Sequence, residues 1–144
     1  MRFRHLALSL VLTGLAACAT TAPIKPAANL SPEAAVTQRI TERWQHIMDK
    51  DYKAAYEFMT PGTRAVMPYA DYEKRMGQAQ IRWMGSTVKQ VNCEDAQTCH
   101  AEVQLDILVL FPGGGIGQTK TISVVDENWL KSGGQWYFLP SKIR

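Results

Sequence analysis

Three cysteines carry the covalent chemistry of this chain, and two of them lie close together. Cys93 and Cys99 are separated by the polar segment 94–98, which is typical of a turn between two strand-like runs. A disulfide across such a hairpin is geometrically reasonable and is stable outside the cytoplasm. Two free thiols or a metal pair are the alternatives. His100 is the nearby histidine, and no second pair of ligands completes a four-ligand site, so we predict a disulfide and no metal.

Acid-base chemistry would need a carboxylate or imidazole that faces a hydrogen-bond donor in an apolar cavity. Asp126 and Asn128 share strand parity with Ile122 and Val124, so these two polar groups could face the interior. A bulge or the end of the strand would instead turn them to solvent, and we prefer this second interpretation.

The remaining polar candidates lie on expected helices, at a strand end or in a loop. Tyr52 or Tyr56 could supply a phenolic donor from a helical wall. His46 lies at the edge of an apolar helix stripe and is expected to be partly exposed, and His100 lies on the polar side of its strand. No G-x-S-x-G nucleophile motif is present, and the glycine-rich segment 111–117 lacks the Lys-Ser/Thr ending of a phosphate-binding loop. That segment is therefore interpreted as a connection between strands.

The first element that must position these groups is a helix from Pro32 to about Met48. Ser31 can cap its free amides, and proline suits the first helical position. Helical spacing then divides the residues between a buried stripe and a solvent side. The stripe holds Val36, Ile40, Trp44 and Ile47, and the solvent side holds Arg39, Glu42 and Arg43.

Two shorter helices are expected before the pattern changes. Asp49 or Asp51 can cap a second helix that contains Tyr52 and Tyr56 and stops at 60–62, a Thr-Pro-Gly sequence. A third, from about 69 to 76, ends at Gly77, a residue type suited to a left-handed C-terminal position.

After Gly77 the apolar residues alternate, which predicts strands. The alternation is sharpest over 100–109, where one side of the strand is apolar and the other polar. Further strands are expected over 82–93, 119–131 and 135–139, in an antiparallel meander. The fold class is therefore α+β, with N-terminal helices packed on a curved antiparallel sheet.

The N-terminal segment resembles a bacterial lipoprotein signal. Arg2 and Arg4 precede a short apolar stretch that closes on Leu-Ala-Ala at 15–17 and then Cys18. The stretch is shorter than the roughly 18 to 20 residues that span a bilayer, and ordinary cleavage around Ala17-Cys18-Ala19 is the other alternative. The resemblance implies lipidation of Cys18, cleavage just before it and, with Ala19 following, delivery to the outer membrane facing the periplasm. The expected organisation is a signal peptide over 1–17, a lipidated flexible tether over 18–30 and one domain over 31–144.

Net charge gives no argument for a nucleic-acid partner. The chain has 16 basic and 13 acidic residues, and loss of Arg2 and Arg4 leaves 14 basic residues against the same 13. A nucleic-acid surface would need a clustered basic face, so we predict no such partner.

The mature chain also resembles the NTF2-like superfamily, a cone-shaped fold of helices packed in a strongly bent sheet. The resemblance covers nearly all of residues 32–140. It rests on Trp44, the segment 51–56, the helix break at 60–64 and the terminal hairpin 129–137. It implies a pocket between the helices and the sheet, which some members use for isomerisation or dehydration. The residues that would line this pocket here are Trp44, Tyr56, Asp126 and Asn128, with Asp126 and Tyr56 as the acid-base pair of an enzyme. The four tryptophans, Trp44, Trp83, Trp129 and Trp136, are expected to form core.

These observations favour a non-catalytic, lipid-anchored periplasmic domain that binds a protein partner or a small apolar ligand at the cell envelope. No cofactor is predicted. An NTF2-like enzyme and a purely structural envelope lipoprotein are the alternatives, because a fold alone does not fix a function. Homodimerisation through the outer sheet face is common among such folds, and the sequence leaves it open.

Overall fold

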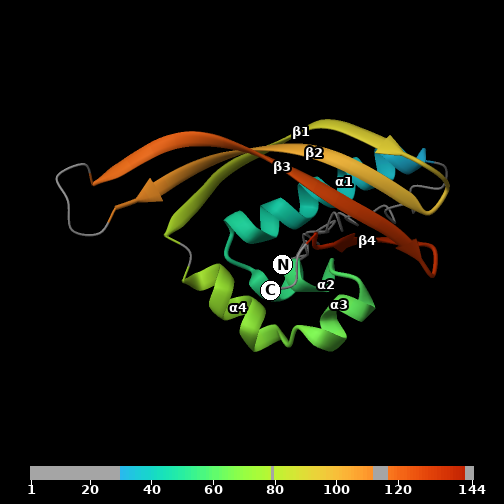
Figure 1. The fold of residues 1–144 in the computed structure, drawn as a ribbon, viewed down its shortest axis with the longest axis horizontal. Helices are drawn as coiled ribbons and strands as arrows, with labels where there is room; N and C mark the ends of the chain where they lie inside the picture. Colours follow the sequence, from blue (N-terminus) through green and yellow to red (C-terminus); the bar gives the residue numbers. More distant parts are fainter. Residues whose placement is uncertain (1–29, 79, 112–116, 142–144) are drawn as a thin grey trace, which may run out of the picture.

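A computed structural model describes residues 30–78, 80–111 and 117–141, and within them a four-stranded sheet arches over four helices (Figure 1). The strands are β1 (Ile81–Cys93), β2 (Thr98–Leu110), β3 (Gln118–Ser132) and β4 (Gln135–Leu139). They pair in the order β1-β2-β3-β4, each antiparallel to the next, which confirms the meander and the α+β class. The final hairpin turns at Gly133 and Gly134, both at positive φ, which glycine adopts without steric cost.

Helix α1 (Pro32–Met48) begins as predicted, with the Ser31 hydroxyl accepting a hydrogen bond from the amide of Ala34 at 3.2 Å. All four residues of its predicted apolar stripe are buried. The prediction for its solvent side was wrong at Arg43, whose side chain is buried, and Arg39 is half-buried. Helical spacing places a charge near the edge of a stripe, but only the tertiary structure supplies the buried partner that lets it enter the core.

Helices α2 (Tyr52–Glu57), α3 (Pro61–Val66) and α4 (Tyr69–Gly77) form the rest of the helical layer. Asp51 caps α2 through the amide of Ala54. The Thr-Pro-Gly sequence at 60–62 ends one helix and also begins α3, because the Thr60 hydroxyl accepts from the amide of Thr63 at 3.1 Å. Gly77 is the last residue of α4 and not a left-handed cap, so that prediction was wrong.

Strand β4 ties the helical layer to the sheet. The Phe138 amide donates to the Phe58 carbonyl at 2.7 Å, and the Thr60 amide donates to the Phe138 carbonyl at 3.0 Å. These bonds close the structure around a core in which Trp44, Trp129 and Trp136 are buried, while Trp83 packs against its edge. The tryptophans therefore belong to the core, as expected.

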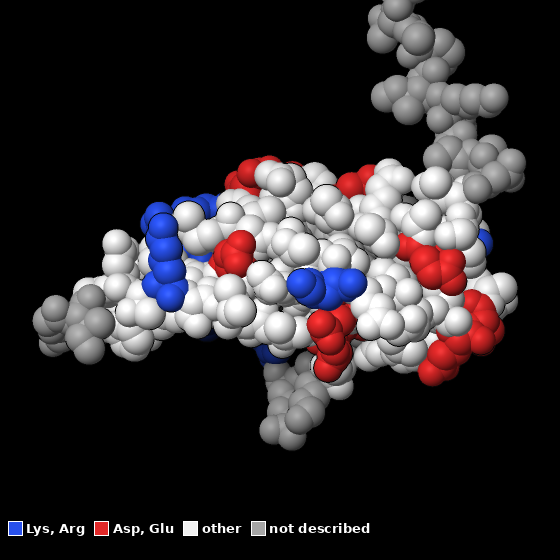
Figure 2. All heavy atoms as spheres, turned by 90° about the horizontal axis from the view of Figure 1, so that it is seen from above, with Lys and Arg blue, Asp and Glu red and all other residues white. Residues whose placement is uncertain are grey.

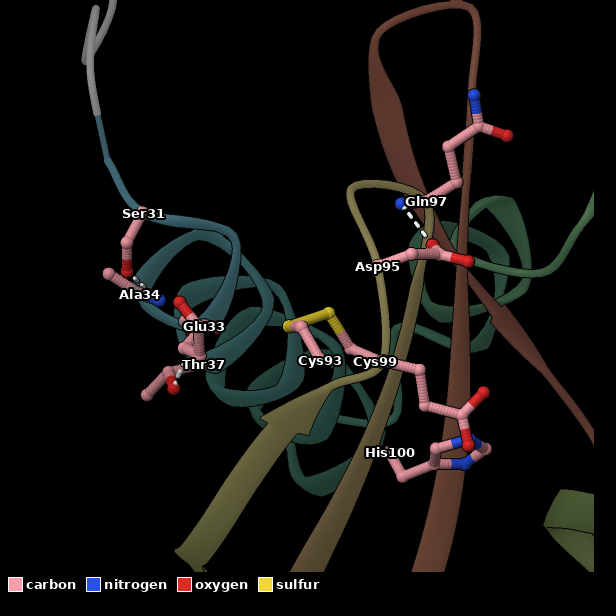
Figure 3. The surroundings of a disulfide bond; sticks show 10 residues. Ser31, Glu33, Ala34, Thr37, Cys93, Asp95, Gln97, Cys99 and His100 are labelled. Atoms are coloured by element: carbon pink, nitrogen blue, oxygen red, sulfur yellow. Dashed lines mark hydrogen bonds and ion pairs between the residues drawn. A yellow bond between two sulfur atoms is a disulfide. The ribbon is translucent and has the colours of Figure 1, made fainter.

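The predicted disulfide between Cys93 and Cys99 joins the facing ends of β1 and β2 (Figure 3). The hairpin turn between them is held by the amide of Gln97, which donates to Asp95 at 2.7 Å, and by the Lys131 amide, which donates to the Gln97 carbonyl. The crosslink thus fixes β1 to β2 at the end of the sheet where β3 also contacts the hairpin turn.

Candidate functional site

A buried carboxylate lies at the centre of the interface between α1 and the sheet. Glu127 is 3% exposed, and its Oε1 accepts hydrogen bonds from Arg43 Nη1 at 2.8 Å and from the Trp44 indole at 2.8 Å. Its Oε2 accepts from the Trp129 indole at 3.0 Å. A buried charge is tolerated when it is paired and hydrogen-bonded in this way. We call these four residues the interior network: Arg43, Trp44, Glu127 and Trp129.

The sequence folds so that two pairs of neighbours meet. Arg43 and Trp44 are consecutive on α1, while Glu127 and Trp129 are two apart on β3 and therefore share a face. The Arg43 guanidinium also lies 3.9 Å from the ring centroid of Phe138 on β4. Arg43 Nε has no hydrogen-bond partner among the described residues. The network thus joins α1 to the β3–β4 hairpin, which lies more than 80 residues later in the chain.

Chemically, the carboxylate of the interior network is held by donors of the protein itself and is not directed at a ligand. A general base needs a lone pair directed at its substrate, whereas three donors from the protein occupy the Glu127 carboxylate. Arg39 also links α1 to the sheet, because its Nε donates to the Trp136 carbonyl at 3.2 Å. Burial lowers the pKa of its guanidinium. The arrangement holds helix and sheet together.

A second buried polar group comes from the helical layer. The Tyr56 hydroxyl donates to the Met67 carbonyl at 2.8 Å, with the Arg64 carbonyl at 3.2 Å, so its proton is committed to the backbone. Tyr72 packs against the Tyr56 ring, and its own hydroxyl has no partner among the described residues. Burial raises the pKa of Tyr72, an effect that Arg43 opposes.

The predicted pocket of Trp44, Tyr56, Asp126 and Asn128 is not found, because the structure divides these residues between two faces of the sheet. Trp44 and Tyr56 are buried in the core. Asp126 is exposed on the outer face, where it pairs in register with Glu102, and Asn128 lies on the same face. Asp126 and Tyr56 therefore do not enter one cavity as an acid-base pair. Asp126 does turn outward, but not through the expected bulge or strand end, because β3 pairs with β2 in unbroken register over 118–130. Ile122 and Val124, which share its parity, face outward as well.

The polar residues of the outer face form an open groove of about 280 Å³ near the disulfide. His100 Nδ1 lies 2.7 Å from Asn128 Oδ1, and its Nε2 lies 3.0 Å from Glu94 Oε1. No group of three potential metal ligands occurs among the residues that the structure describes. His46, on α1, is 3.4 Å from Asp51. Both histidines are thus surface residues with a carboxylate neighbour.

Farther along the outer face, exposed apolar side chains lie among charged ones such as Asp106 and Lys120. Ile122 is 62% exposed, Val124 54% and Met84 51%. A shallow groove of about 400 Å³ runs between Met84 and Ile122. Leu108, on the same side of β2, is buried although it does not belong to the core cluster. We call this set of four residues the outer apolar strip: Met84, Leu108, Ile122 and Val124.

Sequence reasoning did not single out Glu127, placed Arg43 on the solvent side of its helix, and gave Ile122 and Val124 the parity of an interior face, whereas both are exposed. The signal was present in strand parity. Trp129 is the largest side chain of β3, and Glu127 shares its parity. If the inward side of β3 had been assigned from Trp129 and not from Ile122 and Val124, Glu127 would have been predicted inside and Asp126 outside.

The position of the predicted anchor is outside the described residues, since Cys18 and the proposed signal lie within 1–29. Among the residues that are described, no helix is both long and apolar enough to cross a membrane.

Comparison with known proteins identifies the fold. No protein-family model matches the sequence, and no curated protein resembles it closely enough to count as a relative. Among solved structures, a SEC-C motif containing protein from Psychrobacter arcticus is similar over 81% of this chain, with 11% identity and a TM-score of 0.55. This chain spans 64% of that protein's length.

Two further structures are similar to this chain, and one of them is named as NTF2-like. A candidate dehydratase of the NTF2-like family from Streptomyces avermitilis matches 72% of this chain and 89% of its own length, with 10% identity and a TM-score of 0.51. The CaMKII hub of S. rosetta matches 77% of this chain and 94% of its own, with 13% identity and a TM-score of 0.50. Identities this low show the shared α+β architecture alone, since one fold hosts many functions.

Proposed function

We propose that this protein is a non-catalytic binding domain, held at the bacterial cell envelope by a lipid on Cys18, that binds a protein partner through the outer face of its sheet. One observation carries the proposal. On strand β3 the inward carboxylate of Glu127 is fully engaged by the protein, while the outward side chains of Ile122 and Val124 are exposed and apolar. Large apolar side chains exposed together on one face are a feature that a binding partner would explain.

The engaged interior argues against the enzyme alternative. An isomerase or dehydratase would need an acid-base pair in one cavity, and Asp126 and Tyr56 lie on different faces. Glu127 could serve as a base only after breaking hydrogen bonds to Arg43 and two indoles. Removing a partner from a buried ion pair costs about 3–5 kcal/mol, which opposes such a role.

The envelope location rests on the sequence and on the disulfide. The lipobox-like sequence before Cys18 and the Ala-, Thr- and Pro-rich tether after it support a lipid anchor. The Cys93–Cys99 crosslink suits an oxidising compartment. At about 3.3 Å per extended residue, the tether 19–30 would reach up to about 40 Å from the lipid. The outer membrane, facing the periplasm, is the proposed location.

The anchor is tested by the mass of the mature N-terminus. We expect a peptide that begins at Cys18 and carries acyl chains, palmitate among them, and we expect Cys18→Ser to abolish both the lipid and the membrane association. An unmodified chain that still begins at Met1 would contradict the anchor.

The partner is tested by photocrosslinking in living cells. A photoreactive residue at position 124, in the outer apolar strip, should give a discrete crosslinked species. The same residue at position 66 on α3 is the matched control, because Val66 is also apolar and is 67% exposed. Equal crosslinking at both positions, or none at 124, would contradict the proposed surface.

A second copy of this chain is the second candidate occupant, and the charge distribution of the outer face favours it. Arg82 and Lys120 flank Leu108 at one end, and Glu102 pairs with Asp126 toward the other. Seen from above, the leftmost charges of this face are basic, and the largest group of acidic side chains lies toward the right (Figure 2). Two copies related by a two-fold axis would bring unlike charges together.

Sedimentation of the purified protein distinguishes the two occupants. A dimer that is lost on Ile122→Asp and is weakened by high salt would identify the second copy. A monomer at all concentrations would assign the strip to a different protein.

A further inference from the structure

One end of the molecule combines exposed apolar side chains with positive charge. At this end, on the left of Figure 1, α4 and β2 finish and β1 and β3 begin. The Leu110 amide donates to the Gln80 carbonyl at 3.0 Å, and the Phe111 amide donates to the Gly117 carbonyl at 3.1 Å. Leu110 is 37% exposed and Phe111 46%. Two consecutive large apolar residues are therefore open to solvent where β2 ends.

Four exposed cations belong to the same end. Arg82 and Lys120 pair in register with Leu108 from its two sides, so both lie on the outer face near the end of β2. Lys74 and Arg75 lie in the last turn of α4, the helix that leads into β1. None of these four cations forms a salt bridge with another residue that the structure describes. We call these six residues the basic tip: Lys74, Arg75, Arg82, Leu110, Phe111 and Lys120.

The segments that form the basic tip contain no acidic residue. Neither Asp nor Glu occurs in 74–82, 108–111 or 117–120. Asp106, on the outer face, is the first carboxylate met along β2 from its end. In the view from above, the leftmost charged side chains are accordingly basic (Figure 2). The positive charge of the tip is thus not offset within its own segments.

We propose that the basic tip binds the surface of a membrane that contains anionic lipids. The negative potential of such a surface attracts Lys and Arg, while apolar side chains between them enter the headgroup region. A soluble phosphate would engage the cations but would leave Leu110 and Phe111 in water. The combination of charge and exposed apolar residues therefore favours a lipid surface. This inference goes beyond the proposed partner binding and does not depend on the outer apolar strip.

The proposed anchor would bring the tip within reach of a membrane. The tether joins the domain at Ser31, on the side of the disulfide (Figure 3). From there α1 runs for 17 residues, about 25 Å at a rise of 1.5 Å per residue. Its last residue, Met48, lines the same groove as Gly77 and Leu110. An extended tether of about 40 Å is longer than this helix, so the tip can reach the surface in which the lipid is inserted.

Cosedimentation with vesicles tests the tip without the anchor. The sample is the proposed mature chain, residues 18–144 with Cys18→Ser, because a retained signal or an attached lipid would bind membranes by itself. We expect saturable binding to vesicles of equal parts phosphatidylglycerol and phosphatidylcholine. Binding to phosphatidylcholine alone should be at least about tenfold weaker, and high salt should weaken binding to the anionic vesicles.

A pair of double variants tests the cations. Arg82→Gln combined with Lys120→Gln should raise the Kd for the anionic vesicles roughly 30-fold, about fivefold for each charge near the surface. Lys89→Gln combined with Lys131→Gln is the matched control, because it removes two exposed cations outside the tip. The control should raise the Kd by no more than about twofold, since charges far from the surface are screened.

A second pair of variants tests the apolar part of the tip. Phe111→Ser should raise the Kd about fivefold, because the exposed half of the ring no longer enters the headgroup region. Val66→Ser changes an exposed apolar residue on α3 and should leave the Kd unchanged. All the altered side chains are exposed, and far-UV circular dichroism spectra should match that of the unaltered chain.

Equal binding to both kinds of vesicle, or equal effects of the tip variants and their controls, would overturn the inference. Competition by glycerol phosphate beyond that of sodium chloride at the same ionic strength would also overturn it, and would assign the cations to a soluble phosphate. Failure of the anchor is separately visible in the mass of the N-terminus, and failure of the outer-strip partner in the crosslink at position 124.

Discussion

Each face of strand β3 holds a residue type that is usually found on the other. The inner face places a charged residue, Glu127, between two tryptophans, while the outer face exposes Ile122 and Val124 to solvent. Polar groups enter a core when their hydrogen bonds are satisfied there, and apolar groups stay outside a folded chain at a cost in hydration. The comparison indicates that the inner face stabilises the fold and that the outer face is available to bind a partner.

The largest expected effect breaks the inner face. Glu127→Gln leaves the buried Arg43 without its counter-charge and should lower the free energy of unfolding by about 3–5 kcal/mol, measured by urea denaturation. Asp126→Asn, one residue away on the exposed side, is the control and should change it by no more than about 0.5 kcal/mol.

An apolar replacement of the whole pair sharpens that result. Arg43→Met combined with Glu127→Leu should recover part of the stability, because no unpaired charge is then buried. If Glu127→Gln were as mild as Asp126→Asn, the interior network would not hold the fold as described.

A smaller effect concerns the crosslink at one end of the sheet. Replacing Cys93 and Cys99 by alanine should lower the free energy of unfolding by about 2 kcal/mol, the chain-entropy value for so short a loop. Dithiothreitol should destabilise the unaltered protein by a similar amount and should not affect the variant. Insensitivity of both proteins to reductant would show that the bond does not form.

A third prediction concerns the start of α1, the helix that carries Arg43 and Trp44. Ser31→Ala removes the cap on the Ala34 amide and should cost about 1 kcal/mol by the same denaturation measurement. Thr41→Ala, at an exposed position within the helix, is the control and should have little effect. Equal losses for both variants would mean that the cap contributes nothing specific.

The smallest effect on stability belongs to the outer face. Val124→Lys should change the free energy of unfolding by no more than about 0.5 kcal/mol, since the side chain is already exposed. The same change should abolish the interaction of the outer apolar strip, measured by loss of the crosslinked species or of the dimer. A large loss of stability would place Val124 in the fold rather than at an interface.

The sequence predicts the elements well where local patterns decide them. Ser31 and Pro32 mark the start of α1, and the alternation around Val103 marks β2, because caps and periodicity act over a few residues. The disulfide was predictable for the same reason. Which face of β3 is inside was not, because alternation gives two sides without saying which is buried.

The interior network could not be predicted from local sequence patterns. Arg43 has the spacing of a helix-edge residue, and its burial depends on Glu127, 84 residues later in the chain. Sites assembled from distant segments need the tertiary structure.

The most direct test of the central claim is the accessibility of position 124 in its native membrane. Cysteines 93 and 99 are bonded, and Cys18 is proposed to be lipidated, so Val124→Cys provides a single reactive thiol, with Val66→Cys as the control. Maleimide labelling at 124 relative to 66 should fall severalfold in native membranes compared with the purified, diluted protein. An unchanged ratio would mean that nothing covers the outer apolar strip, and would contradict the account.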